Sequence, residues 1–98
     1  MIIEPPTPVR VLDAAGRSVL VTERGLIPAA PAQLQIEDSP YRTSAIVTAW
    51  AGPWPVDERW WDPAAHRRLV RLQATTDQGA AYLLRLTGGR WWVEAIYD

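Results

Sequence analysis

The sequence predicts a small all-β single domain with an N-terminal hairpin and a C-terminal three-strand antiparallel meander, arranged as a barrel or as two layers. Apolar and polar residues alternate along residues 67–98, and glycine-containing turns divide that segment into three parts of strand length. A similar alternation flanks a turn within residues 9–22. The length of 98 residues, 48% of them apolar and 21% charged, suits one folded unit of soluble composition.

The start of the chain differs in composition from the rest. Residues 1–8 (MIIEPPTP) are rich in proline and show no regular alternation. We expect them to form an extended, linker-like lead-in, and we place a single β-rich domain over residues 9–98. All nine prolines lie at or before Pro63, so the last third of the chain is free of the residue that interrupts inner strands.

Residues 9–22 have the pattern of a β-hairpin. Valines alternate with other residues on both sides of the sequence Asp-Ala-Ala-Gly, which is typical of a type I turn followed by a left-handed glycine. This turn places Val11 beside Val19 and Val9 beside Val21.

The middle of the chain contains two further predicted strands. Residues 33–37 alternate and predict a short strand, and the β-branched run at 43–50 predicts another. Residues 38–41 have the composition of a turn between them. Residues 52–66 hold three prolines and three tryptophans, and they predict an irregular stretch in which 56–61 could form a single helical turn.

The last third predicts a meander with a defined register. Gly88-Gly89 has the dihedral freedom of a two-residue hairpin turn. It pairs residues of the second and third strands as follows: Thr87 with Arg90, Leu86 with Trp91, Leu84 with Val93, and Tyr82 with Ala95. The turn at 77–79 pairs the first strand with the second as follows: Val70 with Leu86, Leu72 with Leu84, and Ala74 with Tyr82. One face is then apolar on all three strands, and a slip of one residue would destroy that agreement.

The opposite face of the meander carries charge and an indole ring. Arg85 is expected opposite Trp92, within reach of a cation–π contact, so Trp91 points inward and Trp92 outward. Arg71 falls opposite Arg85, and two like charges side by side are unfavourable unless an acid lies near. Glu94 is a diagonal neighbour that could supply it, and an acidic partner or a phosphate could serve instead.

Several kinds of chemistry are not expected. The chain has no cysteine and one histidine, His66, so thiolate sites and histidine-based triads are disfavoured. Asp57, Glu58 and Asp62 lack the spacing of a calcium loop, and we interpret them as capping or solvated residues. We therefore expect no enzyme activity, no metal and no cofactor. Because no spanning segment or signal peptide is apparent, we expect a cytoplasmic protein.

The charge balance argues against a dedicated nucleic-acid module. Ten arginines and eleven acids give a net charge of −1. The cluster of His66, Arg67, Arg68 and Arg71 is interpreted as a solvated or protein-facing patch. Weak binding of single-stranded nucleic acid by arginine and tryptophan on a sheet face is the alternative function.

One long motif carries a family resemblance. Residues 50–62 read WAGPWPVDERWWD, and the last hairpin contains Gly-Gly-Arg-Trp-Trp-Val at 88–93. Together with the hairpin at 9–22, this pattern resembles the C-terminal end of ImuB, a catalytically inactive Y-family DNA polymerase homologue of actinobacterial-type mutasomes. The resemblance covers about residues 7–98, and the tryptophan motif is its most specific part.

The resemblance implies a non-catalytic protein-protein interaction module in damage-induced translesion synthesis, part of the SOS response and mutagenesis. Its expected partners are the RecA-like accessory protein of ImuA type and the error-prone DnaE-type polymerase, with at most weak DNA contact and no membrane. A clamp-binding motif is expected upstream in this family. Gln33-Leu34-Gln35-Ile36 matches such a motif only in part, because Glu37 follows it, and we interpret these residues as a strand.

Tryptophan and arginine dominate the energetics of protein interfaces, which guides the choice of contact residues. We expect the partner to bind the tryptophan-rich segment and the polar face of the meander. The candidate partner-binding residues are Trp54, Trp60, Trp61, Arg71, Arg85, Trp92 and Glu94.

Overall fold

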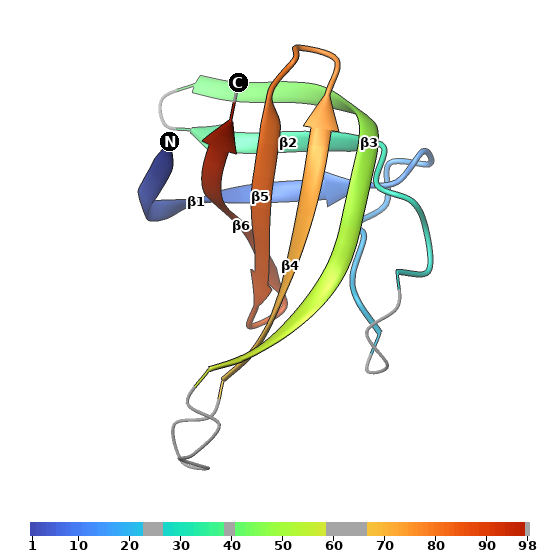
Figure 1. The fold of residues 1–98 in the computed structure, drawn as a ribbon. Helices are drawn as coiled ribbons and strands as arrows, with labels where there is room; N and C mark the ends of the chain where they lie inside the picture. The colour runs from blue at the N-terminus through green and yellow to red at the C-terminus, as the bar shows by residue number, and fades with distance from the viewer. Residues whose placement is uncertain (23–26, 39–40, 59–66, 98) are drawn as a thin grey trace.

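The protein is a closed barrel of six antiparallel strands (Figure 1). The computed structural model describes residues 1–22, 27–38, 41–58 and 67–97. The strands are β1 (Ile2–Leu12), β2 (Gln33–Asp38), β3 (Tyr41–Glu58), β4 (Arg67–Thr76), β5 (Ala81–Thr87) and β6 (Arg90–Tyr97). Each strand pairs with the next in sequence, and β6 closes the barrel on β1. The barrel form of the all-β prediction is therefore confirmed.

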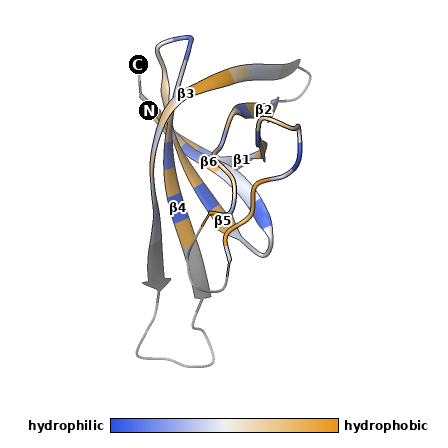
Figure 2. Cartoon of the chain, turned by 90° about the vertical axis from the view of Figure 1, so that its right-hand side faces the viewer, coloured by the Kyte–Doolittle hydropathy of each residue, from blue (hydrophilic) through white to orange (hydrophobic). Residues whose placement is uncertain are grey.

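The barrel interior is filled by the inward-facing residues of the strands. Polar and apolar residues alternate along β4 in Figure 2, as the period of a strand requires. The most deeply buried large side chains are Leu34, Leu72, Leu84, Val11, Val19 and Val93. Trp91 is also in this core, and its indole N–H donates to the carbonyl oxygen of Val19 at 2.7 Å.

The predicted meander is confirmed, with one local difference in register. The predicted pairs between β4 and β5 all form, and Gly88-Gly89 sets the predicted pairs at the start of β6. Beyond Leu84, however, Leu83 pairs with Ala95 and Tyr82 pairs with Ile96 rather than with Ala95. Glu94 is the extra residue, so β6 contains a β-bulge at this point.

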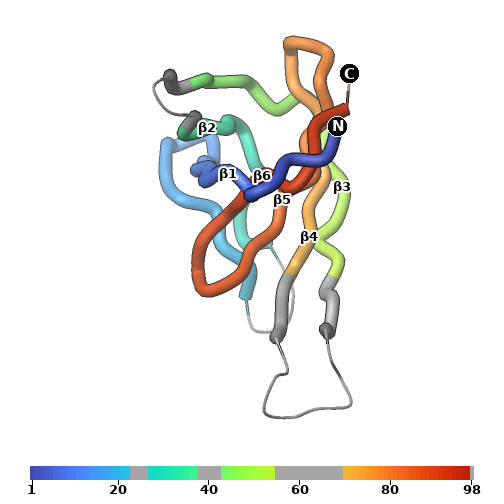
Figure 3. The backbone as a smooth tube through the Cα atoms, turned by 90° about the vertical axis from the view of Figure 1, so that its left-hand side faces the viewer, coloured from blue at the N-terminus to red at the C-terminus, as the bar shows by residue number. Residues whose placement is uncertain are grey.

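The lead-in is part of β1 rather than a linker. Ile2 pairs with Ala95 and Thr7 with Val93 on β6, and the register is interrupted between these two pairs. Figure 3 shows β1 running along β6, with both chain termini at the same end of the barrel. Pro5 and Pro6 are tolerated because they lie where the ladder is irregular and few N–H groups are required, whereas Pro8 is paired with Trp92.

The N-terminal hairpin forms only at its turn. The backbone N–H groups of Ala15 and Arg17 both donate to the Asp13 carboxylate at 2.9 Å, and the Val19 N–H donates to the Val11 carbonyl at 2.8 Å. The prediction that Val9 pairs with Val21 is wrong, because Val9 is already paired with β2 and β6. The return segment therefore makes one isolated bridge and no strand.

The middle of the chain holds two strands, as predicted, but the second is much longer than 43–50. β3 runs beside β2, curves, and then runs beside β4 (Figure 1). Its register with β4 shifts at two places, the second between Ala51 and Trp54. Residues 56–58 are strand rather than helical turn. The rest of the predicted helical turn and the centre of the turn at 38–41 lie outside the described residues.

Candidate functional site

The candidate site lies on the outer face of β4, β5 and β6. Arg71 pairs with Arg85, and Arg85 pairs with Trp92, as the sequence predicts. Directly opposed residues of an antiparallel sheet point to the same side. These three side chains therefore stand together on the outside of the barrel, on strands fixed by the core residues of their inner faces.

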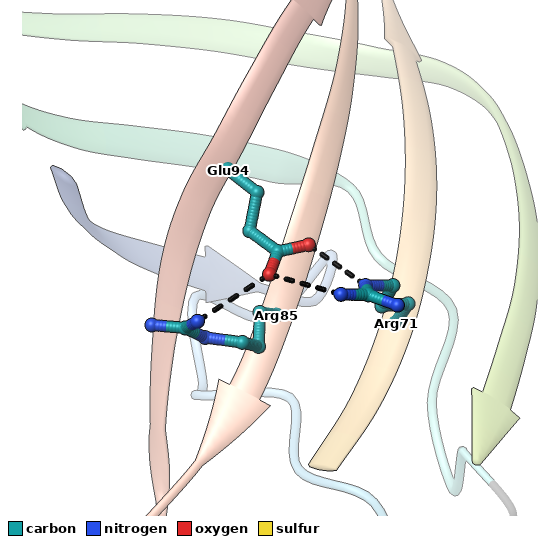
Figure 4. A network of polar contacts seen from close by, with 3 residues as sticks. All are labelled: Arg71, Arg85 and Glu94. Atoms are coloured by element: carbon teal, nitrogen blue, oxygen red, sulfur yellow. Dashed lines mark hydrogen bonds and ion pairs between the residues drawn. The ribbon is translucent and has the colours of Figure 1, made fainter. Parts of the chain in front are cut away.

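Glu94 joins the two arginines. Its carboxylate accepts from Arg71 Nε at 2.9 Å and from Arg71 Nη2 at 3.4 Å, and it accepts from Arg85 Nη1 at 3.4 Å. Figure 4 shows the carboxylate between the two guanidinium groups. The predicted role of Glu94 as the acid that relieves the arginine pair is confirmed.

The bulge in β6 explains why one glutamate reaches both arginines. A bulge increases the local twist of a strand and re-aims its side chains. Glu94 is the bulged residue, and its side chain is only 15% exposed, against 35% for Arg71 and 27% for Arg85. The network is therefore half-buried, which limits screening by solvent more than in a fully exposed ion pair.

Two hollows open on this face, and Arg85 and Pro6 line both of them. The first, which we call the glutamate hollow, has a volume of ≈ 360 Å³. Its lining includes the apolar residues Ile2, Ile3 and Leu83 and the charged residues Glu4, Arg71, Arg85 and Glu94. The second, the tryptophan hollow, has a volume of ≈ 380 Å³. Its lining includes Pro5, Pro6, Arg85, Thr87, Arg90 and Trp92.

Trp92 is half-buried in the wall of the tryptophan hollow. The guanidinium carbon of Arg90 lies 5.7 Å from the centre of its ring. The cation–π contact predicted for Arg85 is thus made by Arg90, which precedes the Trp91-Trp92 pair on the same strand. Arg85 Nε and Trp92 Nε1 are both buried and have no hydrogen-bond partner among the described residues.

Trp54 lies beside this cluster. It pairs with Arg71, and 45% of its surface is exposed. Gly52 lets the chain pass close to β4, because a Cβ atom there would lie 3.1 Å from the Arg71 carbonyl oxygen. Trp50 is 41% exposed but pairs with Ala74, whose side chain is inside the barrel. Trp60 and Trp61 lie outside the described residues.

The structure thus brings together five of the seven predicted contact residues, namely Trp54, Arg71, Arg85, Trp92 and Glu94. Sequence reasoning missed Arg90, Pro5 and Pro6. The prolines could not be found from local pattern, because only the closure of β1 on β6 carries them to this face. Arg90 carried a signal, since the Gly88-Gly89 turn places it next to the tryptophan pair.

Neither a metal-ligand cluster nor a membrane-spanning helix is found in the part of the chain that the structure describes. Within these residues, no group of three or more His, Cys, Asp or Glu residues is placed to hold a metal ion. Nor is there a helix in them of the length and apolarity needed to cross a membrane. Comparisons with protein families, with curated proteins and with solved structures find no match to this chain.

Proposed function

We propose that this chain is a non-catalytic interaction module of an ImuB-like translesion-synthesis scaffold. In this proposal it acts in the cytoplasm after DNA damage and recruits the RecA-like accessory protein of ImuA type, the error-prone DnaE-type polymerase, or both. The family assignment is supported by the residue pattern at 50–62 and 88–93.

The observation that carries the proposal is the exposed Trp54 beside a held pair of arginines. Interface hot spots are enriched in tryptophan and arginine, and they are most effective where the side chains are pre-positioned. The Glu94 carboxylate fixes Arg71 and Arg85 on the outside of the barrel before any partner arrives. This face therefore offers a partner an aromatic anchor and oriented donors at little further ordering cost.

The test is capture of each purified partner by the full chain, followed by calorimetry. We expect Trp54→Ala to weaken binding by about 30-fold or more, the range of an interface hot spot. Trp50→Ala is the matched control, because Trp50 is similarly exposed but shares the face of Ala74 rather than that of Arg71. If the wild-type chain binds neither partner, the proposed function is wrong. If Trp54→Ala and Trp50→Ala weaken binding equally, the proposed site is wrong.

The nucleic-acid alternative is tested in the same series. The glutamates beside the arginines and the net charge of −1 disfavour a phosphate backbone. We expect a single-stranded oligonucleotide to show no salt-dependent binding at low ionic strength. Binding that falls steeply with salt, together with no capture of either protein partner, would favour the alternative instead.

A further inference from the structure

Two residues that line the tryptophan hollow each carry a buried N–H group with no acceptor among the described residues. Arg85 Nε and Trp92 Nε1 belong to residues that are paired directly across β5 and β6. Both nitrogen atoms are buried, and neither has a partner among the described residues. Buried N–H groups in folded proteins are nearly always hydrogen-bonded, so two adjacent donors of this kind in the wall of a hollow indicate a place for an acceptor.

The charge of this hollow is also unbalanced. Two of its lining residues are arginines, Arg85 and Arg90, and its described lining contains no acid. Arg90 is exposed and already held over the Trp92 ring. The glutamate hollow differs, because Glu4 and Glu94 line it together with Arg71 and Arg85. Arg85 is paired with Glu94 on the side of the glutamate hollow, whereas Arg90 has no ion pair among the described residues, so the tryptophan hollow keeps an excess of positive charge.

We infer that the tryptophan hollow binds the side-chain carboxylate of an Asp or Glu in an extended segment of the partner protein. A carboxylate supplies oxygen acceptors for Arg85 and Arg90 and for the Trp92 indole, and arginine forks match its geometry. This inference rests on the proposed function, and it names the chemistry that the partner presents. An aliphatic residue next to the acid in the partner would reach Ile2, Ile3 and Leu83 in the adjoining glutamate hollow.

The neighbouring glutamates favour one carboxylate over a polyanion. A nucleic-acid strand that placed one phosphate in the tryptophan hollow would bring further phosphates along this face, towards Glu4 and Glu94. The negative charges of these phosphates and of the two glutamates would repel each other. A peptide carries its charge on one side chain and can present an apolar neighbour to the same region.

The rim of the hollow can admit such a group. Pro5 and Pro6 belong to its lining, and they lie where the register between β1 and β6 is interrupted. Proline has no N–H to bond to the ladder, so this part of β1 is held to β6 less firmly than the paired residues from Thr7 onward. The inference requires a small outward shift of this segment to bring the carboxylate to the two donors, and the ladder from Thr7 onward can stay paired during it.

The experiment follows the side-chain N–H signals of the full chain by NMR during titration with a blocked peptide that carries glutamate beside leucine. The same peptide with glutamine in place of glutamate is the matched ligand. We expect the glutamate peptide alone to shift the Trp92 indole and Arg85 Nε–H signals downfield. It should bind about tenfold or more tightly than the glutamine peptide, as the loss of a charged hydrogen bond predicts.

Three variants locate the site. Arg85→Gln and Arg90→Gln should each weaken binding of the glutamate peptide by about tenfold. Arg90→Gln matters because Arg90 makes no contact with Glu94 in the network, so a loss there does not reflect damage to that network. Arg17→Gln, an exposed arginine in the turn after β1, should leave the affinity unchanged.

Several outcomes overturn the inference. They are equal shifts with the two peptides, no shift of the two signals, tighter binding of oligothymidylate at the same signals, and an equal loss of affinity in the Arg17→Gln control. Capture of both protein partners in the presence of saturating glutamate peptide also removes the inference but leaves the proposed function intact. Peptide binding as expected, with no capture of either partner, removes the proposed function and leaves the carboxylate site.

Discussion

Replacing Glu94 by glutamine removes the charge that holds Arg71 and Arg85 side by side. Glutamine has the same shape, but it is a weaker acceptor and turns an N–H₂ group towards the guanidinium groups. Of the three hydrogen bonds that the Glu94 carboxylate accepts, one is 2.9 Å long and two are 3.4 Å long. Hydrogen bonds to charged groups contribute about 1.5–3 kcal/mol each when well made, and partial exposure of both arginines reduces this.

We therefore expect Glu94→Gln to lower the free energy of unfolding by about 1.5 kcal/mol in total. For a domain of this size, that loss lowers the thermal midpoint by about 6–12 °C. Urea denaturation followed by tryptophan fluorescence measures the first quantity, and calorimetry measures the second. Added salt should partly restore the variant, because it screens the repulsion between the two arginines.

Glu37→Gln is the control for this prediction. Glu37 also pairs with an arginine, but Arg10 Nε lies 3.7 Å from its oxygen and the two side chains are 66% and 36% exposed for arginine and glutamate. Such exposed pairs contribute little, so the change should stay within about 0.5 kcal/mol. Equal losses in Glu94→Gln and Glu37→Gln, or a Glu94→Gln variant that salt destabilises further, would refute the reasoning.

Three further predictions test the fold. Trp91→Phe should cost about 2–3 kcal/mol by denaturation, because it removes core volume and leaves the buried Val19 carbonyl oxygen without its indole donor; a cost below that of an exposed-site change would contradict this. Gly52→Ala should cost about 2–3 kcal/mol, since its φ is +109° and the new Cβ would meet a β4 carbonyl oxygen at 3.1 Å. Gly16→Ala, at φ +80° with no atom within 4 Å, should cost only about 1 kcal/mol, and equal costs would remove the close-approach argument. Deletion of residues 1–6 should lower the free energy of unfolding by about 1–2 kcal/mol, because it removes the Ile2–Ala95 pair and the packing of Ile3 on the core. If these residues were only a linker, their deletion would leave the stability unchanged.

The register of the last three strands could be predicted because two short turns and the alternation agree. Fixing Thr87 opposite Arg90 sets the neighbouring pairs, and only one register makes the inner face apolar on all three strands. The bulge at Glu94 could not be predicted in this way. Ala95 and Ile96 are both apolar, so alternation does not distinguish which of them lies opposite Tyr82.

The strands of the N-terminal half were harder to predict because the strands that pair with them are remote in sequence. The proline-rich start has the composition of a linker, and its strand conformation depends on pairing with β6 at the other end of the barrel sequence. The segment after Gly16 has the pattern of a strand, but β2 and β6 already occupy both edges of β1 at Val9. Local propensity was overridden by pairing with a remote strand in the first case and by competition for strand edges in the second.

The candidate site also has a part that the sequence predicts and a part that depends on the closed barrel. The pairing of Arg71 with Arg85 follows from register within the meander, and the sequence predicts it together with Glu94 as a nearby acid. The contact of one glutamate with both arginines depends on the β6 bulge, which the sequence does not predict. The tryptophan hollow needs Pro5 and Pro6, which reach it only when the barrel closes. The position of Arg90 over Trp92 depends on side-chain conformation, which a pattern of alternation does not specify.

Closure between β1 and β6 has a consequence for how the protein is made. The ladder that completes the barrel joins Ile2 to Ala95, so β1 leaves the ribosome long before the strand that it must pair with. Until then β1 has an unpaired edge, which is the kind of surface that seeks strands of other chains. Contacts this distant in sequence also slow folding. Nascent chains of this domain are therefore most vulnerable to aggregation just before β6 emerges, when a chaperone gives the greatest benefit.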